Sequence, residues 1–193
     1  MDFSLVAFIL TIRRFIGLLF TPYKTMRTIS VEGKRSELTW IYFFSILYFL
    51  LSGNVRAELW GIGTMIGLIL FSVSFFSLLP TTSMIQKKWE TICITWTYTL
   101  FPTLLWFYTT LIFYIVLPPP RSVSTLGMIF SIFYIAFSVS LLAWKLILVY
   151  LGIRFSLRAH VYRVLFYILI YLTVSIPIWI TLYRLGMSRV PFV

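Results

Sequence analysis

Residues 92–113 read ICITWTYTLFPTLLWFYTTLIF, a stretch in which no side chain is charged. A helix of roughly 20 predominantly apolar residues is long enough to cross the hydrocarbon core of a bilayer. Its one break is Pro102, and proline is tolerated in membrane helices, where it typically produces a kink. The stretch therefore predicts a kinked, membrane-spanning helix rather than the core helix of a soluble domain.

The composition of the whole chain agrees with this prediction. Of 193 residues, 61% are hydrophobic and 11% are charged, whereas soluble domains are roughly half apolar and about a quarter charged. Lysine and arginine outnumber the acids by 16 to 5. These bases lie between apolar runs, which favours lipid headgroups and membrane orientation over nucleic acid as their partner.

Five apolar stretches meet the length requirement, and glycine, proline or charged residues separate them. We therefore predict an all-α, polytopic membrane protein, in which residues 1–37 form a cytoplasmic, interfacial region and residues 38–193 form a five-helix transmembrane bundle. Pro177 is predicted to kink the last span as Pro102 kinks the third. The expected spans are 38–55, 62–79, 92–117, 126–151 and 161–183.

Residues 3–12, FSLVAFILTI, are apolar but are followed at once by Arg13 and Arg14. No base precedes the run and no small-residue cleavage site follows it, so it does not resemble a signal peptide. An amphipathic helix lying along the membrane surface is favoured, and a sixth span is the alternative.

A second short helix is predicted in FTPYKTMRTIS, residues 20–30. Thr21 fits the N-cap position, and Pro22 fits the first helical position, where its missing N–H costs nothing. Tyr23, Met26 and Ile29 recur three residues apart on one face. We expect this face to lie on the cytoplasmic leaflet with the bases directed toward phosphates.

The bases also predict an orientation. Twelve of them fall on the side of the membrane that holds the N-terminal region, and four fall on the other side. The positive-inside rule then places the N-terminus in the cytoplasm and the C-terminus outside.

A basic collar on the cytoplasmic side is expected to contact anionic headgroups or an acidic partner surface. Lys145 is predicted to reach the headgroups by snorkelling, rather than to serve an intramembrane function. His160 is read as a solvated loop residue rather than a proton switch. The expected contact residues are Arg13, Arg14, Lys24, Arg27, Lys145, Arg154, Arg158 and Arg163.

Two small-xxx-small spacings, Gly63 with Gly67 and Gly127 with Ser131, allow helices to approach closely. Packing within the chain is the favoured interpretation, ahead of a dimer face. The six threonines of the third span either line a cavity or bond to their own helix, and the second interpretation is favoured.

Catalytic chemistry has little support in the sequence. It contains no zinc-ligand spacing, phosphate loop or nucleophile elbow, and its single cysteine, Cys93, cannot form an internal disulfide. None of the five acids lies near the centre of a predicted span. We therefore expect a protein that is not an enzyme and that has no cofactor or metal.

Three stretches of the chain resemble the prokaryotic branch of the Yip family, the Ypt/Rab-interacting proteins. They are RRFIGLLFTPYKTMRTIS at 13–30, KKWETICITWTYTLFPTLLWFY at 87–108, and the pair of closing spans with their short basic loop at 130–172. The resemblance implies a five-span bundle with a cytoplasmic N-terminus, in a bacterial or archaeal cytoplasmic membrane. It also implies a scaffold or accessory role, in some relatives alongside export machinery.

The acidic, aromatic and glycine-proline motif of eukaryotic members has no counterpart here, so the resemblance does not imply binding to a small GTPase. We expect a scaffold or accessory subunit in a hetero-complex with other integral membrane proteins, within a transport or trafficking system. The alternative is a stand-alone transporter of lipid or a small molecule that uses Pro102 and the threonines of the third span.

Overall fold

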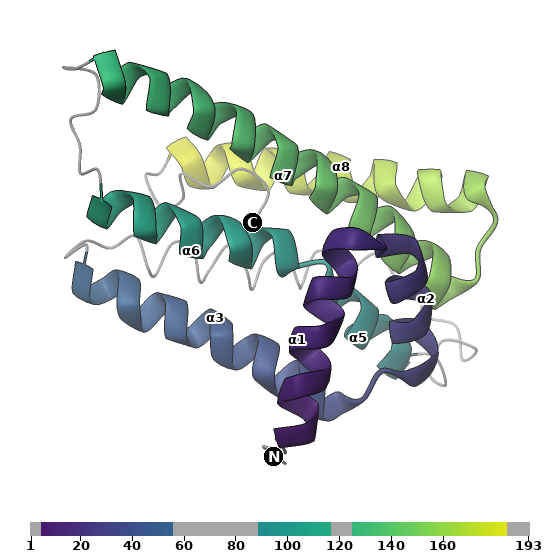
Figure 1. Cartoon of the computed structure of the whole chain (residues 1–193). Helices are drawn as coiled ribbons and strands as arrows, with labels where there is room; N and C mark the ends of the chain where they lie inside the picture. The colour runs from purple at the N-terminus through teal and green to yellow at the C-terminus, as the bar shows by residue number, and fades with distance from the viewer. Residues whose placement is uncertain (1–4, 56–88, 117–124, 185–193) are drawn as a thin grey trace.

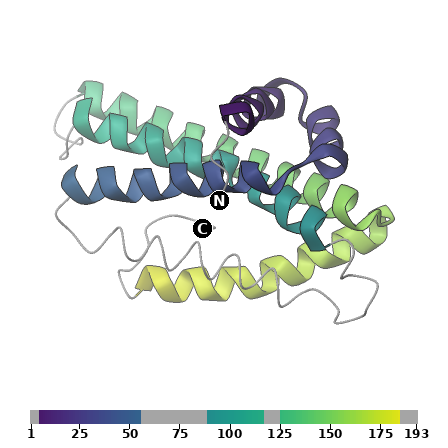
Figure 2. The same cartoon turned by 90° about the horizontal axis from the view of Figure 1, so that it is seen from below.

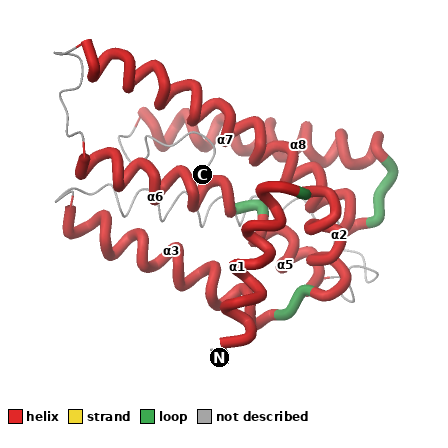
Figure 3. Tube along the Cα trace, viewed as in Figure 1, coloured by secondary structure: helices red, strands yellow, loops and turns green. Residues whose placement is uncertain are grey.

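The computed structural model describes residues 5–55, 89–116 and 125–184, and within each of these ranges the chain forms helices (Figures 1 and 3). The predicted all-α class is confirmed for this part of the chain. The helices are α1 (Leu5–Phe20), α2 (Pro22–Glu32), α3 (Arg35–Val55), α5 (Trp89–Tyr98), α6 (Phe101–Val116), α7 (Thr125–Leu157) and α8 (Val161–Arg184).

Within the described residues, two stretches are long and apolar enough to cross a membrane, Thr91–Val116 and Gly127–Leu157. They coincide with the third and fourth predicted spans. Helices α3 and α8 cover the first and fifth, and Val161–Pro177 is a shorter apolar helix. The second predicted span, 62–79, lies outside the described residues, so the five-span topology stays a prediction.

The N-terminal helices are oriented differently from the long ones. The axes of α3, α6, α7 and α8 are broadly parallel, with α7 running opposite to the other three, whereas α1 crosses in front of them (Figure 1). In the view turned by 90°, α1 is seen nearly end-on and lies outside the layer formed by α3 and α6 (Figure 2). Helix α1 packs against α2 and α3, and α2 packs against α5 and α7.

The third span is broken rather than kinked. The Thr99 N–H donates to the Trp96 carbonyl at 2.9 Å and the Leu100 N–H to the Thr97 carbonyl at 3.1 Å, so α5 ends in tight i→i−3 turns. Helix α6 starts at Phe101, which puts Pro102 in its first turn. Because the first-turn amides of a helix have no intrahelical acceptor, proline costs nothing there. Pro177, in contrast, lies inside the continuous helix α8.

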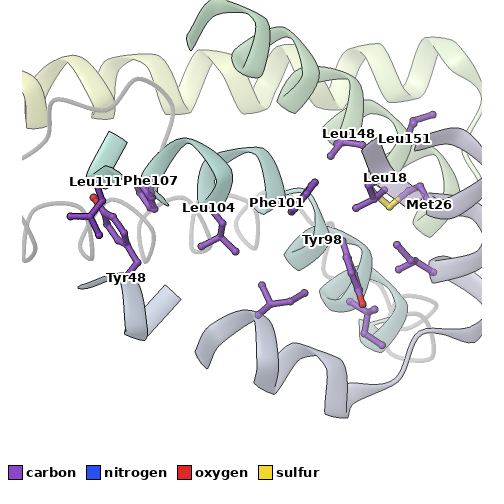
Figure 4. Close-up of a cluster of buried hydrophobic side chains, with 13 residues drawn as sticks. Leu18, Met26, Tyr48, Tyr98, Phe101, Leu104, Phe107, Leu111, Leu148 and Leu151 are labelled. Carbon is purple, nitrogen blue, oxygen red and sulfur yellow. The ribbon is translucent and has the colours of Figure 1, made fainter. Parts of the chain in front are cut away.

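A continuous apolar core joins the bundle to the N-terminal helices (Figure 4). Tyr48 of α3 stacks on Phe107 of α6, with ring centroids 4.5 Å apart. At the other end of the core, Leu18 and Met26, from α1 and α2, lie beside Leu148 and Leu151 of α7.

This core corrects the expectation for α2. Met26 and Ile29 are 0% and 1% exposed, and they pack on the bundle rather than on the leaflet. Tyr23, which was expected on the same face, is half exposed and meets Phe155 of α7 edge to face. The amphipathic pattern therefore predicts the helix correctly, but Met26 and Ile29 of its apolar face are buried in the protein.

Helix α7 continues beyond its predicted end at residue 151. It passes through Gly152 and Arg154 to Leu157, and Arg158 then leaves it with a φ of 49°. Positive φ is uncommon for a residue with a side chain and marks a sharp helix end. Arg158 therefore lies outside the helix that carries Arg154.

Candidate functional site

A buried polar network connects three helices where α1 crosses the end of the bundle. The Arg14 guanidinium on α1 forms an ion pair with the Glu37 carboxylate on α3, and the Tyr98 hydroxyl on α5 donates to the same carboxylate. Glu37 is 0% exposed and Arg14 is 8% exposed. This is the one ion pair between two residues that the structure describes. Arg14 and Glu37 are 23 residues apart in sequence, and Tyr98 and Glu37 are 61 residues apart.

Backbone groups complete the network. The second Arg14 nitrogen donates to the Glu32 carbonyl at 3.3 Å, at the end of α2. The Lys34 N–H donates to Glu37 Oε1 at 3.0 Å, so this carboxylate also serves the first turn of α3. Both carboxylate oxygens are therefore occupied, as a buried charge requires.

Gly33, the residue between α2 and α3, allows this close assembly. A Cβ there would lie 2.5 Å from the Ile29 carbonyl oxygen and 2.6 Å from a methyl group of Ile94 on α5. Only a residue without a side chain fits, and the short connection can then deliver Glu37 to α5.

The network changes the interpretation of two residues. Arg14 was expected at lipid headgroups, but its side chain is directed inward and paired. Glu37 was not singled out, because its partners are distant in sequence. The available signal was a base, Arg14, interrupting an otherwise apolar helical run, which is costly unless an opposite charge is near.

A cavity of about 340 Å³ lies between α1 and α2, beside the network. Arg13 and Lys24, both exposed, stand at its wall with the acidic Glu32. Two of the residues predicted to contact headgroups therefore line the same cavity. Its remaining lining residues are Leu10, Arg14, Gly17, Thr21, Thr25 and Thr28.

The other predicted contact residues are spread out. Arg27 on α2 and Arg163 on α8 are exposed, and so is Arg158 in the connection between α7 and α8. Arg154 is half-buried, and its guanidinium donates to the Tyr150 hydroxyl at 3.1 Å while lying 5.9 Å from that ring. His160 is exposed in the same connection.

Lys145 is 5% exposed and lines a small cavity of about 40 Å³, large enough for a water molecule. Its side chain is buried between helices and not at the surface, so the snorkelling prediction does not describe this structure. Pro102, Thr103 and Trp106 form the α6 side of the cavity, and Ser138 lies on α7. The Trp106 indole N–H donates to the Ser138 hydroxyl at 3.0 Å.

The threonines of the third span bond mainly to their own helix. The hydroxyls of Thr95, Thr97, Thr99 and Thr109 each donate to a carbonyl three or four residues earlier. Thr110 instead pairs with the Tyr134 hydroxyl of α7 at 2.8 Å. This is the pattern expected for packing rather than for a polar groove.

The predicted packing positions are described in part. Gly127 is buried in α7, and its carbonyl accepts from the Ser131 hydroxyl at 2.8 Å. Gly63 and Gly67 lie outside the described residues. In the part of the chain that the structure describes, no three His, Cys, Asp or Glu side chains lie close enough to hold a metal ion.

The chain was compared with protein-family models, curated proteins and solved structures, and none of them matches it. The resemblance to the Yip family therefore rests on the three stretches of sequence quoted above. It stays a prediction.

Proposed function

We propose that the chain is an integral membrane protein that acts as a scaffold or accessory subunit, through contacts with other membrane proteins and with lipid. The observation that carries the proposal is the outer surface of α7. Only 22% of its most apolar stretch is buried inside the protein.

The exposed apolar face of α7 extends over several helical turns. Ile129, Ile132, Phe133 and Val139 are each more than half exposed, and α8 also exposes Leu165, Phe166 and Leu169. Soluble monomers rarely expose contiguous apolar patches larger than a few hundred Å². Lipid chains and the helices of a partner are the environments in which such a surface is stable.

The N-terminal region supports a fixed orientation for this bundle. Helix α1 exposes Leu5, Ile9, Ile16 and Leu19 on its outer side while it buries Thr11 and Arg14 against the protein. A helix with polar groups inside and apolar groups outside is suited to a membrane interface. The Arg14–Glu37 ion pair would then fix the interfacial helix to the bundle.

The proposal predicts a stoichiometric membrane partner. The affinity-tagged protein would be extracted in a mild detergent, purified and examined by native mass spectrometry. We expect a discrete hetero-complex that disappears when Phe133→Arg is placed on the outer face of α7, and that persists with the matched change His160→Arg at an exposed position in the connection between α7 and α8. Recovery of the chain with lipid alone, at all detergent concentrations, would contradict the scaffold role.

A stand-alone transporter is the second candidate, and the buried Lys145 favours it. An ionisable side chain inside a membrane helix typically marks a substrate or ion pathway. Here it lies beside the break between α5 and α6, with Pro102 and Thr103 on the same cavity. This candidate predicts that purified protein in liposomes moves a substrate without a partner, and that Lys145→Met stops transport while Lys145→Arg retains part of it.

A further inference from the structure

On α1, an exposed apolar face lies next to a face that lines the cavity between α1 and α2. Ile9, Ile12, Ile16 and Leu19 form its exposed apolar stripe at helical spacing. Three residues that each directly follow a member of that stripe in sequence line the cavity between α1 and α2: Leu10, Arg13 and Gly17. One residue turns a helix by about 100°, so the cavity opens directly beside the apolar stripe.

The side chains that line the cavity carry a net positive charge. Arg14 is neutralised by Glu37, which leaves Arg13 and Lys24 against the single carboxylate of Glu32. In the described part of the chain neither Arg13 nor Lys24 is held in an ion pair. Arg13 comes from α1 and Lys24 from α2, and both side chains are of the kind that donates charge-assisted hydrogen bonds to phosphate.

The N-terminus of helix α2 adds to the positive charge at the cavity. The Thr21 hydroxyl donates back to the Gly17 carbonyl at 3.2 Å and does not cap the first amides of α2. Pro22 has no N–H, and the Thr25 N–H donates to the Thr21 carbonyl at 3.0 Å, so the partial positive charge of the first turn lies on the amides of Tyr23 and Lys24, of which Lys24 lines the cavity.

We propose that the cavity between α1 and α2 binds the phosphate of a phospholipid headgroup, with Arg13 and Lys24 as its ligands and the acyl chains lying along the apolar stripe of α1. A volume of about 340 Å³ lies at the lower end of known ligand pockets, which suits a headgroup and not a whole lipid. The adjoining stripe favours a lipid over a free anion. The inference rests on the proposed membrane location, and it replaces a diffuse basic collar by one site.

The test is a titration of the protein in a non-ionic detergent with dihexanoyl phosphatidylglycerol, followed by calorimetry. We expect saturable binding that weakens about tenfold or more in Arg13→Gln/Lys24→Gln, because each lost charge-assisted hydrogen bond costs of the order of a tenfold change in affinity. Arg158→Gln/Arg163→Gln removes the same charge from exposed positions elsewhere and should leave binding unchanged. Equal weakening in both double variants would overturn the site.

A second variant tests shape without changing charge. Thr28 lines the cavity, and its hydroxyl donates to the Lys24 carbonyl of its own helix at 3.1 Å, so Thr28→Leu fills space without breaking a contact between helices. It should weaken lipid binding at least as much as the charge change, and normal binding would contradict the proposal. Inorganic phosphate should compete poorly, and competition at equal concentration would assign the site to a free anion instead.

The membrane location is tested separately by alkaline carbonate extraction. Release of wild-type protein would overturn the proposed function itself. Retention in the membrane, together with unchanged lipid affinity in Arg13→Gln/Lys24→Gln, would overturn only the headgroup site.

Discussion

Glu37 is the residue on which the junction of α1, α3 and α5 depends most. Replacement by Gln removes the charge that compensates the buried Arg14, and breaking a buried ion pair on one side typically costs about 3–5 kcal/mol. We expect Glu37→Gln to lose about 3 kcal/mol, measured as the free energy of unfolding in detergent. Glu32→Gln, at an exposed position on the same junction, should change stability little.

A double-mutant cycle with Arg14→Leu distinguishes a coupled pair from two independent side chains. If the pair is coupled, adding Glu37→Leu to Arg14→Leu costs much less than Glu37→Leu alone. Additive losses would show that the guanidinium and the carboxylate do not depend on each other.

Gly33 allows a second prediction at this scale. The Cβ of Gly33→Ala would meet the Ile29 backbone oxygen at 2.5 Å, so the loop or α5 must shift. Overpacking of this kind costs about 1–3 kcal/mol, and we expect a corresponding fall in the free energy of unfolding. Gly17→Ala is the matched comparison, because its close contact is to the Thr25 side chain, which can rotate away. A smaller effect at Gly33 than at Gly17 would contradict the geometry.

At the scale of elements, α1 provides the sharpest test. Ile9 and Ile16 lie seven residues apart on its outer face, which is about 10 Å along a helix. Spin labels at Ile9→Cys and Ile16→Cys, in a Cys93→Ser background, report depth through their accessibility to oxygen and to a polar relaxing agent. We expect both labels at nearly the same shallow depth, and a label at Ile132→Cys on α7 to lie deeper. Depths that differ by about 10 Å would show that α1 spans the membrane.

Some boundaries and contacts of these helices could be predicted from the sequence and others could not, for physical reasons. Pro22 starts α2 because proline suits the first turn of a helix, and this signal is local. The fourth span is predicted to end at residue 151, yet α7 continues through Gly152, whose missing side chain allows close contact, with a Thr99 methyl group only 3.1 Å from a Cβ there. The Arg14–Glu37–Tyr98 network lay beyond prediction because its members are assembled by packing between distant segments. Local signals can be read from sequence, whereas a glycine that serves a contact resembles one that ends a helix.

At the scale of the whole molecule, the charge distribution and the fold make one joint prediction about α7. Its start at Thr125 should face outward and its end near Ala159 should face the cytoplasm, because most bases lie on the latter side. Single cysteines at these two positions, in a Cys93→Ser background, can be treated in intact cells with a membrane-impermeant maleimide. We expect Thr125→Cys to react in intact cells and Ala159→Cys to react only after the membrane is opened. Labelling of both in intact cells would show that α7 does not cross, and the reverse pattern would show that the positive-inside rule orients this bundle wrongly.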